Sequence, residues 1–155
     1  MADFILARAI HVVAVVLWIG GVAFVTTVLM PSIRRDVSAD ERLARFHRFE
    51  GRFARLASIW VGLAGASGLW MVWRADLWSR LVDPQYWWMH AMVAVWMGFA
   101  LMLFVVEPLF LRRRMSASVN AAKEFGRMER IHQVALVASL LTIAGAVAGS
   151  HGWVF

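Results

Sequence analysis

Five histidines are the residues whose chemistry stands out, because several of them lie within or beside long apolar stretches. They are His11, His47, His90, His132 and His151. Neutral imidazole is a good metal ligand, and an unpaired ionisable group is costly inside hydrocarbon. Cysteine is absent, which excludes disulfides, thiolate metal sites and covalent haem attachment of the c type. The histidines are therefore the leading candidate ligands for a metal or cofactor.

Four apolar stretches must position these histidines: residues 4–30, 56–73, 86–111 and 131–150. Each is long enough to cross about 30 Å of hydrocarbon at about 1.5 Å per residue, the second only just. The chain has 155 residues, of which 61% are hydrophobic and only 17% are charged, so a soluble globular domain is excluded. The sequence predicts an all-α integral membrane protein. We expect one domain over residues 1–155, folded as an up-down-up-down four-helix bundle.

The basic residues predict the orientation of this bundle. Seven arginines lie between Pro31 and Arg55, and six lysines and arginines lie between Arg112 and Arg130. Under the positive-inside rule, the first and third loops are then cytoplasmic, and both termini lie outside the bacterial inner membrane. The net charge of +6 is explained by topology signals and contacts with anionic lipids, so no nucleic-acid partner is expected. The first span lacks signal-peptide features and is expected to be a mature helix.

Local patterns lead to three further expectations. Ser38 and Glu41 have capping-box spacing, so the second helix is expected to begin near Ala39. The outer tryptophans are expected to form an aromatic belt at the headgroup level: Trp73, Trp87, Trp88 and Trp153. Glycines at helix-packing spacings favour either close backbone approach or room for a flat ligand: Gly62, Gly65, Gly68, Gly145 and Gly149.

Depth along the spans separates the histidines into two layers. Counting about 1.5 Å per residue from each span midpoint, His11 lies about 9 Å toward the outer side. His90 and His151 each lie about 13 Å toward the same side, so these three share one layer. His132 lies about 15 Å and His47 about 25 Å toward the inner side, which makes them the weaker pair.

The outer layer can hold a haem. The first and third helices of such a bundle usually lie diagonally, so His11 and His90 are expected as the two axial ligands of one iron. Trp18 shares a helix face with His11, and Met97 shares one with His90, which predicts an apolar lining for the porphyrin. His151 is expected as a neighbouring partner or alternate ligand. His132 and His47 are candidates for a second, inner haem, provided that the second helix bends.

Three stretches of the sequence resemble a known family. HVVAVVLWIGG (11–21), WWMH (87–90) and AGAVAGSHGW (144–153) are similar to small bacterial membrane proteins of the copper resistance protein D (CopD) domain type. They are more distantly similar to the HemJ-type protoporphyrinogen oxidases. The second resemblance implies a b-type haem with matching roles for His11 and His90, and the first implies copper uptake or tolerance. The HemJ-type lysine two residues after the third-helix histidine is Met92 here, so protoporphyrinogen oxidation is not implied.

The leading hypothesis is one-electron transfer by haem b near the periplasmic side, with a quinol or another small molecule as redox partner. Bis-histidine ligation leaves no open iron position and therefore favours electron transfer over oxygen activation. One alternative is a copper-binding or copper-uptake protein in which His11, His90 and His151 converge, with Met97 or Met102 as deeper ligands. Another is a structural subunit of a larger membrane complex, and the glycine-rich faces are equally compatible with a homodimer.

Overall fold

The computed structural model describes residues 1–106 and 121–153, which are helical with short connections and contain no strand. The end of the predicted third span, residues 107–111, lies outside this described part. Four of its helical segments are long and apolar enough to cross a membrane. The elements in chain order are α1 (Ala2–Phe24), a π-helical turn (Val25–Leu29), α2 (Met30–Asp36), α3 (Arg42–Arg74), two 3-10 turns (Trp78–Leu81 and Pro84–Tyr86), α4 (Trp87–Leu101), a second π-helical turn (Met102–Val106) and α6 (Ala121–Ser150).

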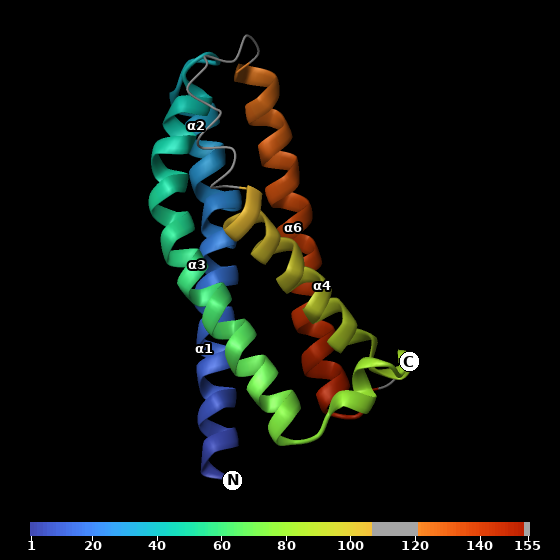
Figure 1. The fold of residues 1–155 in the computed structure, drawn as a ribbon. Coiled ribbons are helices and arrows are strands. Elements are labelled where there is room, and N and C mark those ends of the chain that lie inside the picture. Colours follow the sequence, from blue (N-terminus) through green and yellow to red (C-terminus); the bar gives the residue numbers. More distant parts are fainter. Residues whose placement is uncertain (107–120, 154–155) are drawn as a thin grey trace.

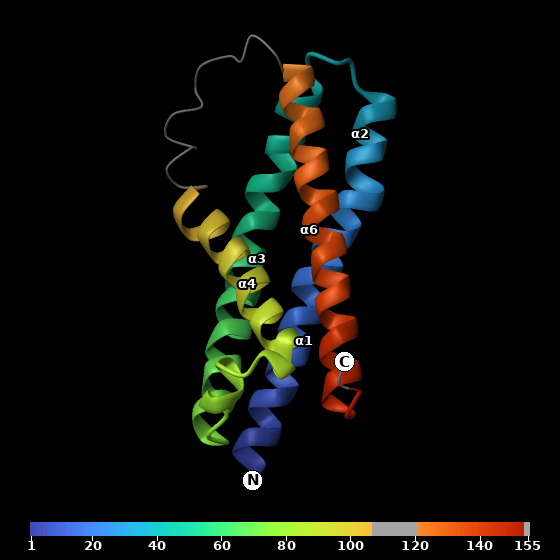
Figure 2. The same ribbon diagram turned by 90° about the vertical axis from the view of Figure 1, so that its right-hand side faces the viewer.

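The helices lie side by side along one axis (Figure 1, Figure 2). The start of α1, the end of α3, the start of α4 and the end of α6 gather at one end of the bundle, which we call the N-terminal end. The opposite end carries α2 and is called the α2 end. The main pairings are α1 with α3 and α4 with α6. In Figure 1, α1 and α4 diverge toward the N-terminal end.

The first helical rod continues past the predicted boundary at Met30. Pro31 lies in the first turn of α2, directly after the π-helical turn Val25–Leu29. Proline has no N–H to donate and its ring crowds the preceding turn, and a π-helical turn is one way in which a helix accommodates such a disruption. The rod therefore runs on to Asp36, and Arg34 lies beyond the apolar part of the helix.

The capping box predicted at the start of the second helix is wrong. The residue preceding α3 is Glu41, and no side chain caps this end of the helix. Instead, the backbone N–H of Glu41 donates to the carbonyl of Ser38 at 3.1 Å, and Arg42 Nε donates to the carbonyl of Val37 at 3.0 Å. Because the turn closes through backbone carbonyls, α3 begins at Arg42, still well before the apolar stretch at residue 56.

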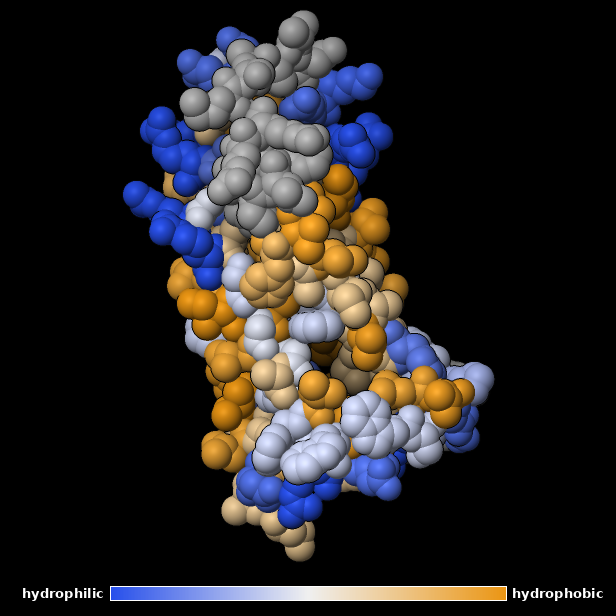
Figure 3. Space-filling model, in the orientation of Figure 1, coloured by the Kyte–Doolittle hydropathy of each residue, from blue (hydrophilic) through white to orange (hydrophobic). Residues whose placement is uncertain are grey.

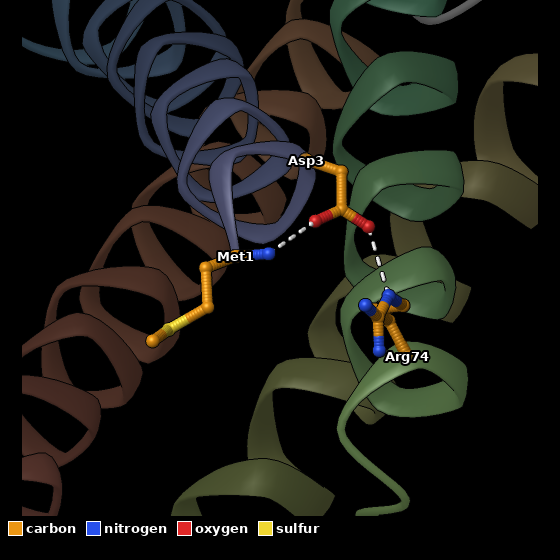
Figure 4. Close-up of polar contacts among 3 residues, drawn as sticks. All are labelled: Met1, Asp3 and Arg74. Atoms are coloured by element: carbon orange, nitrogen blue, oxygen red, sulfur yellow. Dashed lines mark hydrogen bonds and ion pairs between the residues drawn. The ribbon is translucent and has the colours of Figure 1, made fainter.

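Ion pairs join neighbouring helices at both ends of the bundle. At the N-terminal end, Arg74 Nε of α3 donates to Asp3 Oδ2 of α1 at 2.8 Å, and the Met1 ammonium lies 3.1 Å from Asp3 Oδ1 (Figure 4). At the α2 end, Arg34 of α2 pairs with Glu129 of α6. The charged groups are thereby kept at the ends, where water and lipid headgroups can solvate them.

The middle of the molecule is covered by apolar side chains, with hydrophilic residues at both ends (Figure 3). Large exposed apolar residues occur on every long helix, among them Val16, Leu69, Val93 and Leu141. Continuous apolar surface of this extent marks a surface that is covered by another apolar phase. Together with the four long apolar helices, this identifies a multi-pass membrane protein.

Three of the five glycines singled out in the sequence receive indole rings of α4, whereas Gly68 contacts His11 and a Cβ on Gly62 would meet nothing within 4 Å. A Cβ on Gly65 would lie 2.5 Å from the Trp96 ring, and one on Gly149 would lie 2.5 Å from the Trp88 ring. Gly145 meets Trp87 in the same way. The space opened by these missing side chains is therefore filled by indole rings of α4, which was neither of the two expected uses.

Candidate functional site

His11 lies on the inward stripe of α1. The buried residues of this helix include Ala7, Ala14 and Trp18, at the three- and four-residue spacings of one helix face. The imidazole of His11 rests on α3, with its Cε1 3.2 Å from the position of a Cβ on Gly68. Its Nδ1 lies 2.9 Å from the carbonyl oxygen of Ala64. The prediction that His11 and Trp18 share a face is confirmed.

The contacts of His11 select one tautomer. A carbonyl oxygen can only accept a hydrogen bond, so Nδ1 carries the proton and donates it to Ala64. The Ser67 hydroxyl lies 3.3 Å from the same nitrogen, and it also donates to the carbonyl of Leu63 at 2.5 Å. With Nδ1 protonated, Nε2 presents its lone pair. This is the arrangement that a second hydrogen-bonding partner imposes on a histidine that ligates a metal through Nε2.

The helix α4 presents a different face to the bundle than predicted. Trp88 packs on Gly149 of α6, Trp96 packs on Gly65 of α3, and Phe99 meets the Trp18 ring of α1 edge-on at 4.8 Å. Met92 lies four residues from each of the two tryptophans and is partly buried, so it belongs to this same inward face.

His90 lies on the other side of α4. It follows Trp88 by two residues, which turns it by about 200° around the helix. Its face also carries Met97, which is 45% exposed. The Nε2 of His90 lies 2.8 Å from the carbonyl oxygen of Leu81, in the first 3-10 turn of the connection between α3 and α4. The structure thus places His90 against this connection and does not bring it to His11.

Met92 and His11 lie at the same level of the bundle. Trp96 donates its indole N–H to the carbonyl of Val61 at 2.9 Å and packs on Gly65, which sets the alignment of α4 with α3. One turn nearer the N-terminal end, α4 reaches Met92 and α3 reaches Gly68, the residue that His11 contacts. Helix geometry therefore places Met92 of α4 and His11 of α1 at a similar height along α3.

Below this level, toward the α2 end, the space between α1 and α4 is closed by the Trp18–Phe99 pair. Trp18 is only 4% exposed, and its Nε1 is the one buried side-chain nitrogen or oxygen without a hydrogen-bond partner among residues 1–106 and 121–153. Such a donor costs about 1–3 kcal/mol when nothing accepts from it. Figure 3 shows a recess in the middle of the molecule, between α3 and α4.

His151 does not complete a three-histidine site. It is exposed at the end of α6, where its Nδ1 lies 2.8 Å from the carbonyl oxygen of Val147 on its own helix. Within the described ranges, no three residues among histidine, aspartate and glutamate come close enough together to hold a metal ion. The convergence of His11, His90 and His151 that a copper site requires is not present there.

The inner histidines, by contrast, flank a common residue. The ring of Phe46 lies 5.6 Å from the His132 ring and 6.2 Å from the His47 ring, measured between centroids. The Nδ1 of His132 hydrogen-bonds the carbonyl of Met128 at 3.0 Å, and Nε2 of His47 lies 3.9 Å from Glu50. Phe46 and Phe125 pack in one apolar cluster with Val25, Met30 and Ile33. Both imidazoles therefore lie beside a buried phenyl ring.

The outer tryptophans divide into two groups. Trp73, Trp87 and Trp153 are exposed at the N-terminal end, as an aromatic belt requires. Trp88 is 6% exposed and packs on Gly149, so the expectation that it belongs to the belt is wrong. Its indole instead joins α4 to α6.

At the level of His11, the residue on α1 fits the role of a haem ligand. The residue of α4 at this level is Met92 and not the predicted ligand His90. His11 is inward, oriented, and already supplied with a partner for Nδ1. Met92 is the inward residue of α4 at that level, and thioether sulfur is an established axial ligand opposite imidazole. Met92, Ala64 and Ser67 were not among the residues that the sequence predicted for this site. Met92 shares the helix face of Trp88 and Trp96, whose packing on glycines of α6 and α3 only the tertiary structure shows.

Comparison with known proteins adds no identification: no protein-family model, no curated protein and no solved structure matches this chain.

Proposed function

We propose that the protein binds haem b in the membrane and transfers single electrons near the periplasmic face of the bacterial inner membrane. In this proposal the bundle has an up-down-up-down topology, and both termini lie on the periplasmic side. The arginines of α2 and of the start of α3 lie at the α2 end, which supports a cytoplasmic location for that end under the positive-inside rule.

The observation that carries the proposal is the state of His11. Burying an imidazole on the inward stripe of a membrane helix costs free energy unless its nitrogens are hydrogen-bonded or ligate a metal. Its Nδ1 is satisfied by the carbonyl of Ala64 on a neighbouring helix, which leaves Nε2 as a preset ligand. The small residues Ser67 and Gly68 let the ring lie directly against α3, because a Cβ on Gly68 would lie only 3.2 Å from its Cε1.

Haem, when bound, supplies a one-electron iron couple, and the chain sets its properties. His11 of α1 and Met92 of α4 are the residues that would hold the iron. An imidazole–thioether pair favours a higher reduction potential than two imidazoles do. Trp18 and Phe99 would form the apolar floor of the site and keep water away from it. A quinol is a fitting electron donor, because it partitions into the same membrane.

The test is the optical spectrum of the protein purified in detergent after expression with added haem. We expect a Soret band and about one haem per chain by the pyridine haemochrome assay. His11→Ala should abolish the band, Met92→Ala should shift or weaken it, and His90→Ala should leave it unchanged. His132→Ala is the matched control, because it removes a partly buried imidazole from the other layer.

Each result decides a different part of the proposal. A colourless wild-type protein would refute haem binding, and one equivalent of copper without porphyrin would replace it by the copper-binding alternative. A coloured protein whose spectrum changes in His90→Ala but not in Met92→Ala would restore the two-histidine ligation expected from the sequence. A His11→Ala variant that keeps the wild-type spectrum would place the haem elsewhere.

A further inference from the structure

A pocket of about 300 Å³ lies at the N-terminal end, away from the level of His11. It is enclosed by the connection between α3 and α4 on one side and by the last turn of α6 on the other. The connection contributes Arg80, Gln85 and Tyr86, α4 contributes Trp88, and the end of the α6 segment contributes Gly149, Ser150 and Gly152. The pocket therefore has polar side chains on the connection and an indole ring beside the small residues that end α6.

Arg80 is held in this pocket without a countercharge. Its guanidinium carbon lies 5.0 Å from the centre of the Tyr86 ring, a cation–π contact that fixes the side chain. No carboxylate pairs with it in the part of the chain that the structure describes, whereas Arg74 at the same end pairs with Asp3 (Figure 4). Asp83, which is nearby in sequence, accepts a hydrogen bond from the backbone N–H of Gln85 at 3.0 Å.

At the end of α6, carbonyl groups near Arg80 accept hydrogen bonds from backbone N–H groups of the chain itself. The backbone N–H of Trp153 donates to the carbonyl of Ala148 at 3.1 Å, and that of Gly152 donates to Gly149 at 3.1 Å. Gly152 has a φ of 85°, so the helix closes with a Schellman motif. Because this motif satisfies carbonyls of the last turn internally, the guanidinium of Arg80 stays available to a ligand.

We propose that this pocket binds the phosphate group of a phospholipid. A guanidinium matches phosphate oxygens with two parallel N–H donors, and the Gln85 amide and the Tyr86 hydroxyl add neutral donors at the same pocket. Trp78, Trp87 and Trp153 are exposed around the same end, where indole rings mark the headgroup level of a membrane. A lipid phosphate lies at that level, which favours the headgroup over a free anion.

Native mass spectrometry of the delipidated protein tests this site by titration with phosphatidylglycerol and phosphatidylethanolamine. We expect one lipid molecule to bind more tightly than the lipid molecules that bind after it. Arg80→Gln should weaken the affinity for this first lipid about 10-fold or more, as the loss of a charge-assisted pair implies. Arg80→Lys keeps the charge but loses the two-pronged geometry, so it should fall in between. Arg8→Gln is the matched control, because Arg8 is an exposed arginine near the start of α1, at the same end of the bundle, and does not line this pocket. It should bind like the wild type.

Two further probes separate the sources of binding. Dioleoylglycerol has the acyl chains without a phosphate, and its retention at the wild-type lipid affinity would overturn the proposal. Inorganic phosphate that bound as tightly as the lipid would assign the pocket to a free anion and overturn the headgroup. Equal lipid affinity of Arg80→Gln and wild type would overturn the site itself, provided that both variants elute as the same monodisperse species in detergent. These outcomes do not depend on whether the protein binds haem.

Discussion

Replacing Gly65 by alanine tests how α4 is seated on α3. A Cβ at this position would lie 2.5 Å from Cζ2 of Trp96, and 2.7 Å from Cε2 and Nε1 of the same ring. The ring cannot swing away freely, because its Nε1 donates to the carbonyl of Val61 at 2.9 Å. Overpacking of this kind costs about 1–3 kcal/mol. Loss of the hydrogen bond adds about 1 kcal/mol.

The same helix provides the control for this variant. Gly62 lies one turn away, and a Cβ there would meet nothing within 4 Å. Gly62→Ala should therefore be neutral or stabilising by up to about 1 kcal/mol, the usual preference of a helix for alanine over glycine. Gly65→Ala gains the same helix preference for alanine, which offsets part of its overpacking and hydrogen-bond losses. The net effect should be a free energy of unfolding lower by about 1–3 kcal/mol.

The assay is reversible unfolding in mixed micelles of dodecyl maltoside and SDS, followed by circular dichroism. The double variant Gly65→Ala with Trp96→Leu should recover part of the loss, because the smaller side chain leaves space for the new methyl group. If Gly65→Ala were as stable as Gly62→Ala, the indole would not occupy that notch and the assigned face of α4 would be wrong. The inward position of Met92 would then lose its support.

Three further changes can be measured on the same preparations. Trp18→Phe should cost about 1 kcal/mol less than Trp96→Phe in the unfolding assay, because the first removes an indole N–H without a partner and the second removes a bonded one; equal losses would contradict this. Glu129→Gln should cost less than about 1 kcal/mol, since its arginine partner on α2 is 54% exposed, and a larger loss at both low and high salt would show a stronger pair than geometry suggests. Gly68→Val should displace the His11 ring and lower the haem content, whereas an unchanged Soret band would separate that contact from cofactor binding.

Much of the fold follows from the composition of the helices. The four spans were predicted because apolar stretches of this length have few alternatives to helices in a membrane. His11 was placed correctly on the stripe of Trp18, since small residues and large apolar residues alternate around α1 at helical spacing. The long polar start of α3 was also expected, although its first residue was not, because backbone carbonyls close the preceding turn.

The local packing of the aromatic residues was not readable from the sequence. The glycines of α3 and α6 suggested either close helix backbones or an internal ligand, and the structure packs Trp96, Trp87 and Trp88 on three of them, while Gly62 stays open. A glycine shows only that a side chain is missing. Which neighbour occupies the space depends on the rotation of a second helix, and that rotation is a property of the assembled bundle.

The site of His11 illustrates this division. The sequence by itself indicated that the imidazole of His11 lies on the inward stripe of α1, because an ionisable group within a membrane helix faces the interior of the bundle. It did not determine which face of α4 is turned toward the other helices. That helix is apolar on nearly all sides, so no polar stripe marks the face toward the bundle interior. Only the tertiary structure, through the packing of Trp88 and Trp96 on glycines of two neighbouring helices, placed Met92 on the face of these tryptophans and His90 against the connection to α3.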